Sequence, residues 1–587
     1  MINLFKLKSA VWCILLLGAL CLVTIGCGSP SPTPEPTPSP EPTGEPETPV
    51  GVADPRLGLT WTSSPYMTEL AQNYQSDEHE EGGYLAWGVG ATWDRWPFDR
   101  DKVRKVGDTF QFVHDDINYT DTISYDNAFG LNILAIIDGP VPNPGNPDFD
   151  DWAAYVEAIA TTYGADIDAW EIGNEWGLPH QSDLSAENYV DILRTTCEVL
   201  YDHGQGNKPI VLGSPELFAS LFLPQGDYYE HWKEVIRNIA GDREKRNYGY
   251  LSDCLDVVGS HVYGRPSFSY DAIVKAKNNI KWGAGVWITE HGVMWRDEDD
   301  PEDDNPFANK YRQASYIIQQ YVLALVGFET ANIDELNPQQ AMIFYHRFAD
   351  ANTNNENDRY WGIVDWERDV RYPSYDAMSL VTSLLGNVAA PIDMITDPSQ
   401  NIEHFLFDKD GQYIHVLWAS KQESISGFHI TAQGTNPGNC ATVHYQPGNG
   451  GTEDSNDGRF RKFQIKVNSF NEFVIDLPGS TEERFGDGSD GHPSDEPMIG
   501  GPVYILVETN ESCKTSSPTG SASLVCDNGR VVGTALRGYD ETSGLATLTA
   551  ACSPGVTYDL SWTQPGRCRV VLIIVLYISP PTAFPTA

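Results

Sequence analysis

Positive charge is scarce in this sequence. Its 587 residues include 38 lysines and arginines but 82 aspartates and glutamates, which gives a formal net charge of −44 at pH 7. Such a charge repels nucleic acids and anionic lipid surfaces, so neither is expected as a partner. A solvated acidic surface of this kind suits an extracellular protein. The length predicts two to four domains rather than one.

Long apolar runs are also scarce, and the one with the length of a targeting segment lies at the N-terminus. Two lysines precede the run 10–26, and Cys27 follows it. A basic start, an apolar core and small residues before a break describe an export signal. Residues 24–27, Thr-Ile-Gly-Cys, resemble a bacterial lipoprotein box in which Cys27 carries the lipid, although Leu is usual where Thr24 stands.

A stop-transfer anchor is the alternative for this segment, because the run is nearly long enough to span a bilayer. Either way the protein leaves the cytoplasm, and we predict a signal peptide over residues 1–27 of an extracellular protein, lipid-anchored at the cell surface or secreted. Residues 28–54 alternate proline with small or acidic residues. Such a linker cannot bury a core and holds an extended conformation, so we expect a tether.

Short apolar runs recur from about Leu57, and amphipathic helical patterns separate them. The runs occupy residues 57–61, 91–96, 131–138, 168–175, 209–214, 255–263, 286–291 and 341–346. The helical patterns include residues 150–163, 186–203, 310–328 and 374–386. Eight strand–helix units predict an α/β fold, a closed parallel (β/α)8 TIM barrel over residues 55–386.

Two glutamates stand where barrel enzymes keep their chemistry. Glu175 ends the fourth run and Glu290 lies near the end of the seventh, so both belong to the C-terminal face of the barrel. These strands lie across the barrel mouth from each other, and two facing carboxylates form a site for glycoside hydrolysis. Glu171 has inward parity on strand four but lies too low for chemistry, so we expect it to be a paired buried carboxylate.

The motifs around these glutamates resemble those of clan A glycoside hydrolases, nearest to family 39 and family 5-like enzymes. They are 170-WEIGNE-175, 288-ITEHG-292 and, on the sixth strand, 261-HVY-263. The resemblance covers the whole predicted barrel. It implies Glu175 as the acid/base and Glu290 as the nucleophile of a retaining enzyme, in which the two carboxyl groups lie about 5–5.5 Å apart.

The resemblance also implies roles for four neighbouring residues. Asn174 would hydrogen-bond the sugar 2-hydroxyl, with a loop turn as the alternative. Tyr263 would hydrogen-bond Glu290, and His261 would support the site unless it is a satisfied core histidine. Arg95 would keep the nucleophile ionised, the alternative being a salt bridge at the barrel mouth.

Aromatic side chains near these motifs are candidates for a sugar platform, because sugar rings present apolar C–H faces. The candidates are Trp176, Trp295, Tyr345 and Trp361, each of which has a core position as its alternative. The clan often carries Trp at the end of strand eight, but this strand ends Phe-Tyr-His at residues 344–346. Trp361 is the candidate to replace that Trp.

Metal and cofactor chemistry is not expected. The acidic runs 297–304 and 350–358 look like calcium loops, but the second lacks the Gly and Glu that an EF-hand carries at its sixth and twelfth places. Solvated acidic loops are the expectation for both runs. The predicted chemistry therefore needs no metal and no cofactor.

The pattern changes after Gly386 to strands with period-two alternation, bounded by Gly, Asn and Asp. These runs occupy residues 403–408, 412–419, 428–432, 441–445, 461–467, 472–477 and 502–508. They predict an antiparallel β-sandwich over residues 387–508. It resembles the accessory sandwich that follows the barrel in several clan A families, including family 39 β-xylosidases, where such modules usually pack on the barrel.

Four of the ten cysteines fall in the C-terminal region, residues 509–587. In an exported protein they suggest two disulfides with three possible connectivities among Cys513, Cys526, Cys552 and Cys568. Cys197 and Cys254 lie on predicted helix faces, and we expect small buried apolar residues there. The apolar run 569–579 is too short to span a bilayer and is expected to form a final buried strand.

These features predict an exported, retaining glycoside hydrolase that acts on a β-linked plant or microbial polysaccharide or its oligosaccharides. No obligate protein partner is indicated, and the membrane is a partner only through the lipid anchor. Two alternatives stay open. One is a non-catalytic carbohydrate-binding surface lipoprotein on a degenerate barrel, and the other is a transglycosylase, which would use the same residues.

Overall fold

The structure, a computed structural model, describes the chain in segments. They are residues 51, 53–62, 88–115, 117–140, 148–176, 184–213, 227–263, 266–293, 306–349, 361–365, 370–394, 401–420, 424–445, 460–477, 481–483, 498–500 and 503–513, followed by six short strands. The chain divides into two compact units, Pro46–Cys513 and a second that joins Met1–Glu45 with Lys514–Ala587. The predicted signal, Cys27, nearly all of the linker, Trp295 and both acidic runs lie outside the described residues.

Eight parallel strands close into a barrel within Pro46–Cys513. They are β1 (Leu57–Thr60), β2 (Trp93–Asp99), β7 (Asn132–Asp138), β8 (Ala169–Ile172), β9 (Ile210–Leu212), β10 (Val257–Tyr263), β11 (Gly285–Gly292) and β12 (Ala341–Tyr345). Neighbours in the chain are neighbours in the barrel, and β12 closes it by pairing with β1. Each strand overlaps one predicted apolar run, so the (β/α)8 prediction is confirmed.

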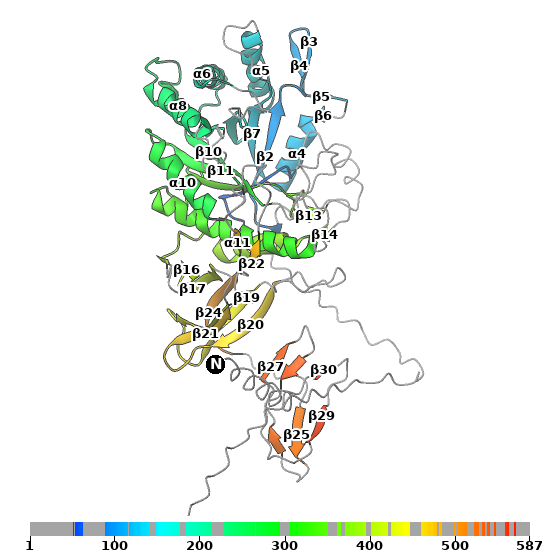
Figure 1. Ribbon diagram of the computed structural model, residues 1–587. Coiled ribbons are helices and arrows are strands. Elements are labelled where there is room, and N and C mark those ends of the chain that lie inside the picture. The colour runs from blue at the N-terminus through cyan, green and yellow to red at the C-terminus, as the bar shows by residue number, and fades with distance from the viewer. Residues whose placement is uncertain are drawn as a thin grey trace, which may run out of the picture. The chain divides into compact units, whose positions relative to one another are not determined.

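Helices cover the outside of this barrel, as Figure 1 shows for α8 and α10 beside β10 and β11. The helices are α4 (Tyr119–Phe129), α5 (Asp148–Tyr163), α6 (Ala186–Asp202), α8 (Asp227–Gly241), α9 (Leu251–Cys254), α10 (Ser267–Asn279), α11 (Pro306–Thr330) and α12 (Pro373–Leu385). Local signals set their ends: the Asn118 side chain caps the start of α4, and Gly130 ends it at a φ of 70°.

Among the described residues, three short hairpins follow barrel strands. Two follow β2 and consist of β3 (Arg104–Val106) with β4 (Thr109–Gln111) and β5 (Val113–His114) with β6 (Ile117–Asn118). The third follows β12 and pairs β13 (Val364–Asp365) with β14 (Val370–Arg371). All three leave the C-terminal ends of barrel strands, on the side where barrel enzymes build their sites.

Apolar side chains fill the lower part of the barrel. One buried cluster takes side chains from seven of the eight strands: Trp93, Leu134, Ala169, Val211, Val257, Trp287, Met342 and Phe344. The eighth strand, β1, contributes Gly58, where a Cβ atom would lie 2.2 Å from the Phe344 ring. The polar residues of the interior therefore gather above this layer, at the C-terminal ends of the strands.

The sandwich follows the barrel. Its larger sheet has the order β15 (Asp393–Met394), β16 (Ile402–Lys409), β17 (Gln412–Ala419), β24 (Tyr504–Ser512), β19 (Asn439–Tyr445) and β20 (Arg461–Lys466). A second sheet pairs β18 (Ile425–Thr431) with β21 (Glu472–Leu477), and a short hairpin pairs β22 (Thr481–Glu483) with β23 (Met498–Gly500). All seven predicted strands are present.

The larger sheet of the sandwich is buried on both faces. Leu417 and Leu506 on one face pack with residues of β18 and β21. On the other face, Phe405 and Val416 belong to the same apolar cluster as Leu380 of α12 and other residues of the barrel helices. Figure 1 shows α11 between the barrel strands and the sheet that contains β16 and β17. Barrel and sandwich thus share a continuous core.

Two disulfides differ from the expectations for the cysteines. Cys197 of α6 is bonded to Cys254 of α9, so the expectation of two buried thiols was wrong. Cys513 is bonded to Cys440 rather than to a cysteine of the tail, because β19 and β24 pair side by side and bring the two Cα atoms within 5.1 Å. Sequence spacing gave no sign of either contact, since 57 and 73 residues separate the partners.

The second unit contains short strands, which pair antiparallel except for the parallel pair β28 and β30. β25 (Ala522–Cys526) pairs with β26 (Val531–Gly533) and β29 (Tyr558–Trp562), while β28 (Leu545–Thr547) pairs with β27 (Arg537–Asp540) and β30 (Arg569–Val570). Cys552 and Cys568 lie outside the described residues. Across the part of the chain that is described, no helix has the length and apolarity needed to cross a membrane.

Candidate active site

Both predicted glutamates lie at the C-terminal mouth of the barrel, but each needs a local irregularity to reach it. β8 ends at Ile172, and Glu175 follows in a left-handed conformation with a φ of 55°. In β11 the pairing register with β10 skips Thr289, so that Ile288 pairs with Ser260 and Glu290 with His261. This bulge lets two successive side chains face the interior and turns Glu290 inward.

Arg95 of β2 connects the polar groups of the site. Its Nε lies 2.5 Å from Oε2 of Glu171, its Nη1 lies 2.6 Å from Oε1 of Glu290, and its Nη2 donates to Oδ1 of Asn174 at 2.9 Å. Burial alone would lower the pKa of Arg95, but the charges of Glu171 and Glu290 outweigh it and raise the pKa. The guanidinium therefore stays charged, and the predicted ion pair of Glu171 is confirmed.

Glu290 is surrounded by groups that favour its carboxylate form. The Tyr263 hydroxyl donates to Oε2, and Nδ1 of His261 lies 3.5 Å from the same oxygen. Burial alone would raise the pKa of Glu290, but the charges of His261 and Arg95 hold that pKa well below its usual range. The carboxylate is thus ionised while remaining 8% exposed at the mouth.

His261 lies between the two glutamates. Its Nδ1 is 2.8 Å from Oε1 of Glu175 and 3.5 Å from Oε2 of Glu290. Its Nε2 lies 3.3 Å from Nη2 of Arg95. Burial alone would lower the pKa of the ring, but the charges of Glu290 and Glu175 raise it, so Nδ1 carries a proton that faces the two carboxylates. Oε1 of Glu175 and Oε2 of Glu290 are consequently no farther apart than the sum of their two distances to Nδ1 of His261.

The four candidate platform aromatics have different places in the structure. Trp361 is partly buried at the site, with its ring centroid 4.9 Å from that of Tyr263. Trp176 is 2% exposed and packs between Trp152 and Tyr189 on the helix side of the barrel, so the expectation of a platform residue there was wrong.

Tyr345 is also a core residue, which corrects the second platform expectation. Side chains alternate along β12: Phe344 faces the barrel interior, so Tyr345 faces the helices, where it is fully buried 5.2 Å from the His291 ring. Trp295 lies outside the described residues. The platform is therefore supported by geometry at Trp361 alone among the described candidates.

Comparisons with known proteins agree with this architecture. No family model matches the chain, and no curated protein matches it. A solved structure of a family 39 glycoside hydrolase from the gut symbiont Bacteroides cellulosilyticus WH2 aligns over 78% of this chain and 81% of its own, with a TM-score of 0.52 and 15% identity. The chain therefore shares the fold of this family 39 structure.

Two further solved structures align less closely. A GH30 endoxylanase from Clostridium papyrosolvens C71 has 12% identity and a TM-score of 0.44 over 78% of this chain and 98% of its own. A family 51 α-L-arabinofuranosidase from Bifidobacterium longum has 13% identity and a TM-score of 0.46 over 78% and 97%.

Two polar residues of the site were missed by the sequence analysis. His346 follows Tyr345, and its Nδ1 lies 3.0 Å from Oγ1 of Thr60 and 3.9 Å from Oε2 of Glu290. Burial lowers the pKa of His346 to about 3 against the opposing charge of Glu290. Strand alternation could have found this residue, since it shares the inward parity of Phe344.

Asp138, at the end of β7, is the second missed residue. It accepts a hydrogen bond from Nε1 of Trp176 at 2.8 Å. Burial raises the pKa of Asp138 to about 6, and the nearby charge of Asp99 acts in the same direction. The available signal was its position, because a carboxylate at the C-terminal end of a barrel strand belongs to the face where sites are built.

Proposed function

We propose that this protein is a retaining glycoside hydrolase that cleaves β-linked oligo- or polysaccharides by double displacement. The observation that carries the proposal is the convergence of Glu175 and Glu290, from β8 and β11, on Nδ1 of His261 at 2.8 and 3.5 Å. The two oxygens that face this nitrogen therefore lie closer together than the range of about 6.5–9.5 Å that separates the carboxyl groups of inverting pairs. This supports direct attack by a carboxylate rather than by a water held between the two.

The environments of the two glutamates support different roles. Glu290 is buried, charged and bonded to Arg95 and Tyr263, which suits a nucleophile that must be ionised before it attacks. Glu175 has no contact with Arg95 among the described contacts, and its side chain is 22% exposed beside His261. This more open position suits a group that exchanges protons with a leaving alcohol and with water.

The reaction then proceeds in two displacements. Glu290 attacks the anomeric carbon while Glu175 donates its proton to the glycosidic oxygen, so the bond to the leaving sugar breaks and a glycosyl ester of Glu290 forms. Glu175, now a carboxylate, takes a proton from water, and the resulting hydroxide equivalent attacks the same carbon. The ester bond breaks, Glu290 regains its charge, and the product keeps the original anomeric configuration.

Two further residues are assigned to substrate binding in this proposal. The Oδ1 atom of Asn174 already accepts from Arg95, which orients Nδ2 as the donor for the sugar 2-hydroxyl. Trp361, beside Tyr263 and His346, offers an aromatic surface for a sugar ring. Trp295 stays a candidate platform residue from its sequence position. Cys27 is proposed to carry a lipid that anchors the protein outside the cell.

Rescue by azide tests the assignment of the two glutamates. Glu175→Ala should still be glycosylated by a dinitrophenyl β-glycoside, because that leaving group needs little protonation, but it should stall when water must be activated. Azide needs no base, so it should restore turnover and give a β-glycosyl azide. Glu290→Ala should give an α-azide from a β-glycosyl fluoride, or no product.

The reverse pattern of azide products would exchange the two roles. Glu157→Gln, on the exposed surface of α5, serves as a matched control and should keep wild-type activity. Wild-type activity in both active-site variants, or no turnover of any aryl glycoside or polysaccharide by the wild type, would reject the proposal in favour of a binding protein. Added acceptor sugars would reveal a transglycosylase through longer products.

The anchor has its own test. Full-length protein should partition with membranes, and Cys27→Ser should abolish the lipid modification. Mass spectrometry that finds an unmodified mature N-terminus elsewhere would contradict the anchor without affecting the catalytic proposal.

A further inference from the structure

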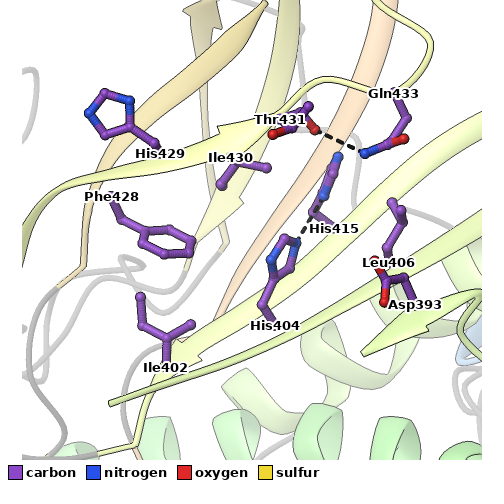
Figure 2. A pocket seen from close by; sticks show the side chains of 10 residues that line it. All are labelled: Asp393, Ile402, His404, Leu406, His415, Phe428, His429, Ile430, Thr431 and Gln433. Carbon is purple, nitrogen blue, oxygen red and sulfur yellow. Dashed lines mark hydrogen bonds between the residues drawn. The ribbon is translucent and has the colours of Figure 1, made fainter. Parts of the chain in front are cut away.

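A pocket of about 390 Å³ lies in the β-sandwich and is lined only by sandwich residues (Figure 2). Its floor is formed by two histidines on neighbouring strands, His404 of β16 and His415 of β17, which are 2% and 1% exposed. Its rim is exposed and carries Asp393, Thr431 and Gln433. The volume falls in the range of about 300–1,000 Å³ that small-molecule sites occupy.

The two histidines continue a chain of hydrogen bonds that starts at a buried carboxylate. Glu508 of β24 accepts the backbone N–H groups of Gln433, Gly434 and Thr435 at 2.8–2.9 Å. Its Oε1 also lies 2.7 Å from Nε2 of His415. On the far side of that ring, Nδ1 of His415 lies 2.9 Å from Nε2 of His404.

This chain determines which nitrogen of His404 carries the proton. Burial alone would raise the pKa of Glu508, but the bonds from His415 and the backbone N–H groups lower it, so the carboxylate is ionised and only accepts. His415 therefore donates through Nε2, and in the neutral pair its Nδ1 accepts from Nε2 of His404. Nδ1 of His404 is then left with a lone pair.

That lone pair has no partner inside the protein. Nδ1 of His404 is buried and makes no hydrogen bond to any residue that the structure describes. Burial lowers the pKa of His404 to about 3, so the ring stays neutral. In Figure 2 this nitrogen is on the side of the ring that faces Phe428 and Ile402 across the pocket. A buried acceptor without a donor is rare in folded proteins, and here a pocket adjoins it.

The remaining lining restricts the chemistry of a ligand. Phe428 is partly buried and stands edge-on to the His404 ring, with centroids 6.2 Å apart. Ile402 and Ile430 add apolar surface, and the polar side chains of Thr431 and Gln433 stand at the rim. An anion would meet a lone pair and the carboxylate of Asp393. A ligand that donates a hydrogen bond while presenting an apolar face fits these groups.

We propose that this pocket is a second carbohydrate-binding site, which holds one neutral sugar residue. A sugar hydroxyl donates to Nδ1 of His404, and the C–H face of the ring packs on Phe428. Thr431 and Gln433 bind the outward hydroxyls. The site uses neither Glu175 nor Glu290, so it goes beyond the proposed function and stands without it.

Nitrogen NMR of the histidines tests this site directly. The protein is the full chain with Glu290→Gln, labelled with ¹⁵N in the imidazoles, and the probes are the methyl β-glycosides of xylose, glucose and galactose and methyl α-L-arabinofuranoside. At least one probe should bind with saturation and shift the Nδ1 resonance of His404, which is assigned by its loss in His404→Phe. Before the sugar is added, this resonance should have the position of an unprotonated nitrogen.

Variants separate this pocket from the barrel mouth. Phe428→Ala should weaken the binding that shifts His404 at least tenfold and should leave the fold intact, because Phe428 is only partly buried. Phe470→Ala is the matched control, since Phe470 is 80% exposed in the same sandwich and does not line the pocket. It should bind as the parent does.

The proposal fails if no probe shifts His404, if Nδ1 proves to be protonated in the free protein, or if Phe428→Ala binds as tightly as the parent. Saturable binding that shifts only residues of the barrel mouth would also overturn it, while supporting the proposed function. Conversely, a His404 shift in a protein whose wild type hydrolyses no glycoside would retain the pocket and reject the enzyme.

Discussion

The barrel and the sandwich each bury a glutamate beside histidines, but they compensate its charge differently. In the barrel, Glu290 faces the guanidinium of Arg95, which it shares with Glu171. In the sandwich, Glu508 has no cationic Arg or Lys partner among the described ion pairs. It accepts three backbone N–H groups and one imidazole instead.

This difference separates a site suited to reaction from one suited to recognition. A carboxylate that is held by a full positive charge and reaches an open mouth can attack a carbon atom and later recover its charge. The carboxylate of the sandwich has its lone pairs occupied and is screened from the pocket by two rings. Glu508 acts on the pocket only by fixing the tautomer of His404. The ring of His404 can accept a hydrogen bond from a ligand, but the pocket contains no carboxylate from Glu508 that could act as a nucleophile.

The largest expected effect comes from removing the cation of the barrel. Arg95→Met leaves Glu171 and Glu290 buried without their partner, which should cost about 3–5 kcal/mol of unfolding free energy and abolish turnover. Glu508→Gln keeps one of the two acceptor oxygens, and with it two of the four hydrogen bonds, so it should cost less, about 1–3 kcal/mol. Urea unfolding of both variants measures the contrast, and equal losses would show that the two carboxylates are stabilised alike.

The barrel and the sandwich can also be compared by how much a disulfide stabilises each of them through the entropy of the unfolded chain. Cys197–Cys254 in the barrel closes 57 residues and Cys440–Cys513 in the sandwich closes 73. Replacing either pair by serine should destabilise the protein by about 4 kcal/mol, because loop entropy grows only slowly with length. Calorimetry should show one shared transition shifting in both cases, since the regions share a core. Two separate transitions would contradict that coupling.

Lowering the pH should reduce the free energy of unfolding through a buried histidine in the barrel and through one in the sandwich. Burial is the first cause that lowers the pKa of His346 and of His404 to about 3. The unfolded chain binds these protons below about pH 6.5 while the folded chain does not, so each histidine removes stability as the pH falls from there toward 3.

Replacing either histidine by asparagine should therefore flatten the acid loss of stability, by at most about 1.4 kcal/mol per pH unit. Urea unfolding between these limits measures the slope for each variant. An unchanged slope for His346→Asn or His404→Asn would mean that the side chain already titrates normally in the folded protein.

The smallest effect concerns the platform. Trp361→Ala should lower kcat/KM about fivefold, as expected from the loss of one aromatic contact with a sugar. Tyr345→Phe should lower kcat/KM less than this, because it removes only a long hydrogen bond from the Tyr345 hydroxyl to the carbonyl of Trp361 at 3.4 Å and leaves the aromatic surface of Trp361 in place. A larger loss in Tyr345→Phe than in Trp361→Ala would reverse the assignment of the two aromatics.

Alternation of apolar residues was enough to predict every barrel strand, but not the direction of the side chains that matter most. Counted from Trp287, which faces the interior, Glu290 should point toward the helices. The bulge at Thr289 reverses this, and a bulge has no periodic signature. The motif 288-ITEHG-292 pointed to Glu290 by resemblance, where parity alone would have excluded it.

Other misses have different physical origins. Cys197 and Cys254 meet because α6 and α9 pack together, which is a tertiary contact that neither helix pattern contains. The place of Trp176 beside Glu175 predicts a ring that is free to stack on sugar, but the ring packs over Gly173, where any Cβ would collide with it. His346 belongs to none of the motifs around the glutamates, although alternation from Phe344 along the strand predicts that it points inward.

The sheet of β16, β17 and β24 has a consequence for how this protein can be divided or recombined. Because Phe405 and Val416 on one face of this sheet belong to the same apolar cluster as residues of the barrel helices, a barrel cut after Gly386 would expose apolar helix residues to water. The sandwich is accordingly not a domain that can be removed or exchanged independently of the barrel. A fusion protein that contains the catalytic barrel must also contain this sheet. Substitutions at the shared core of one part will also affect the packing of the other.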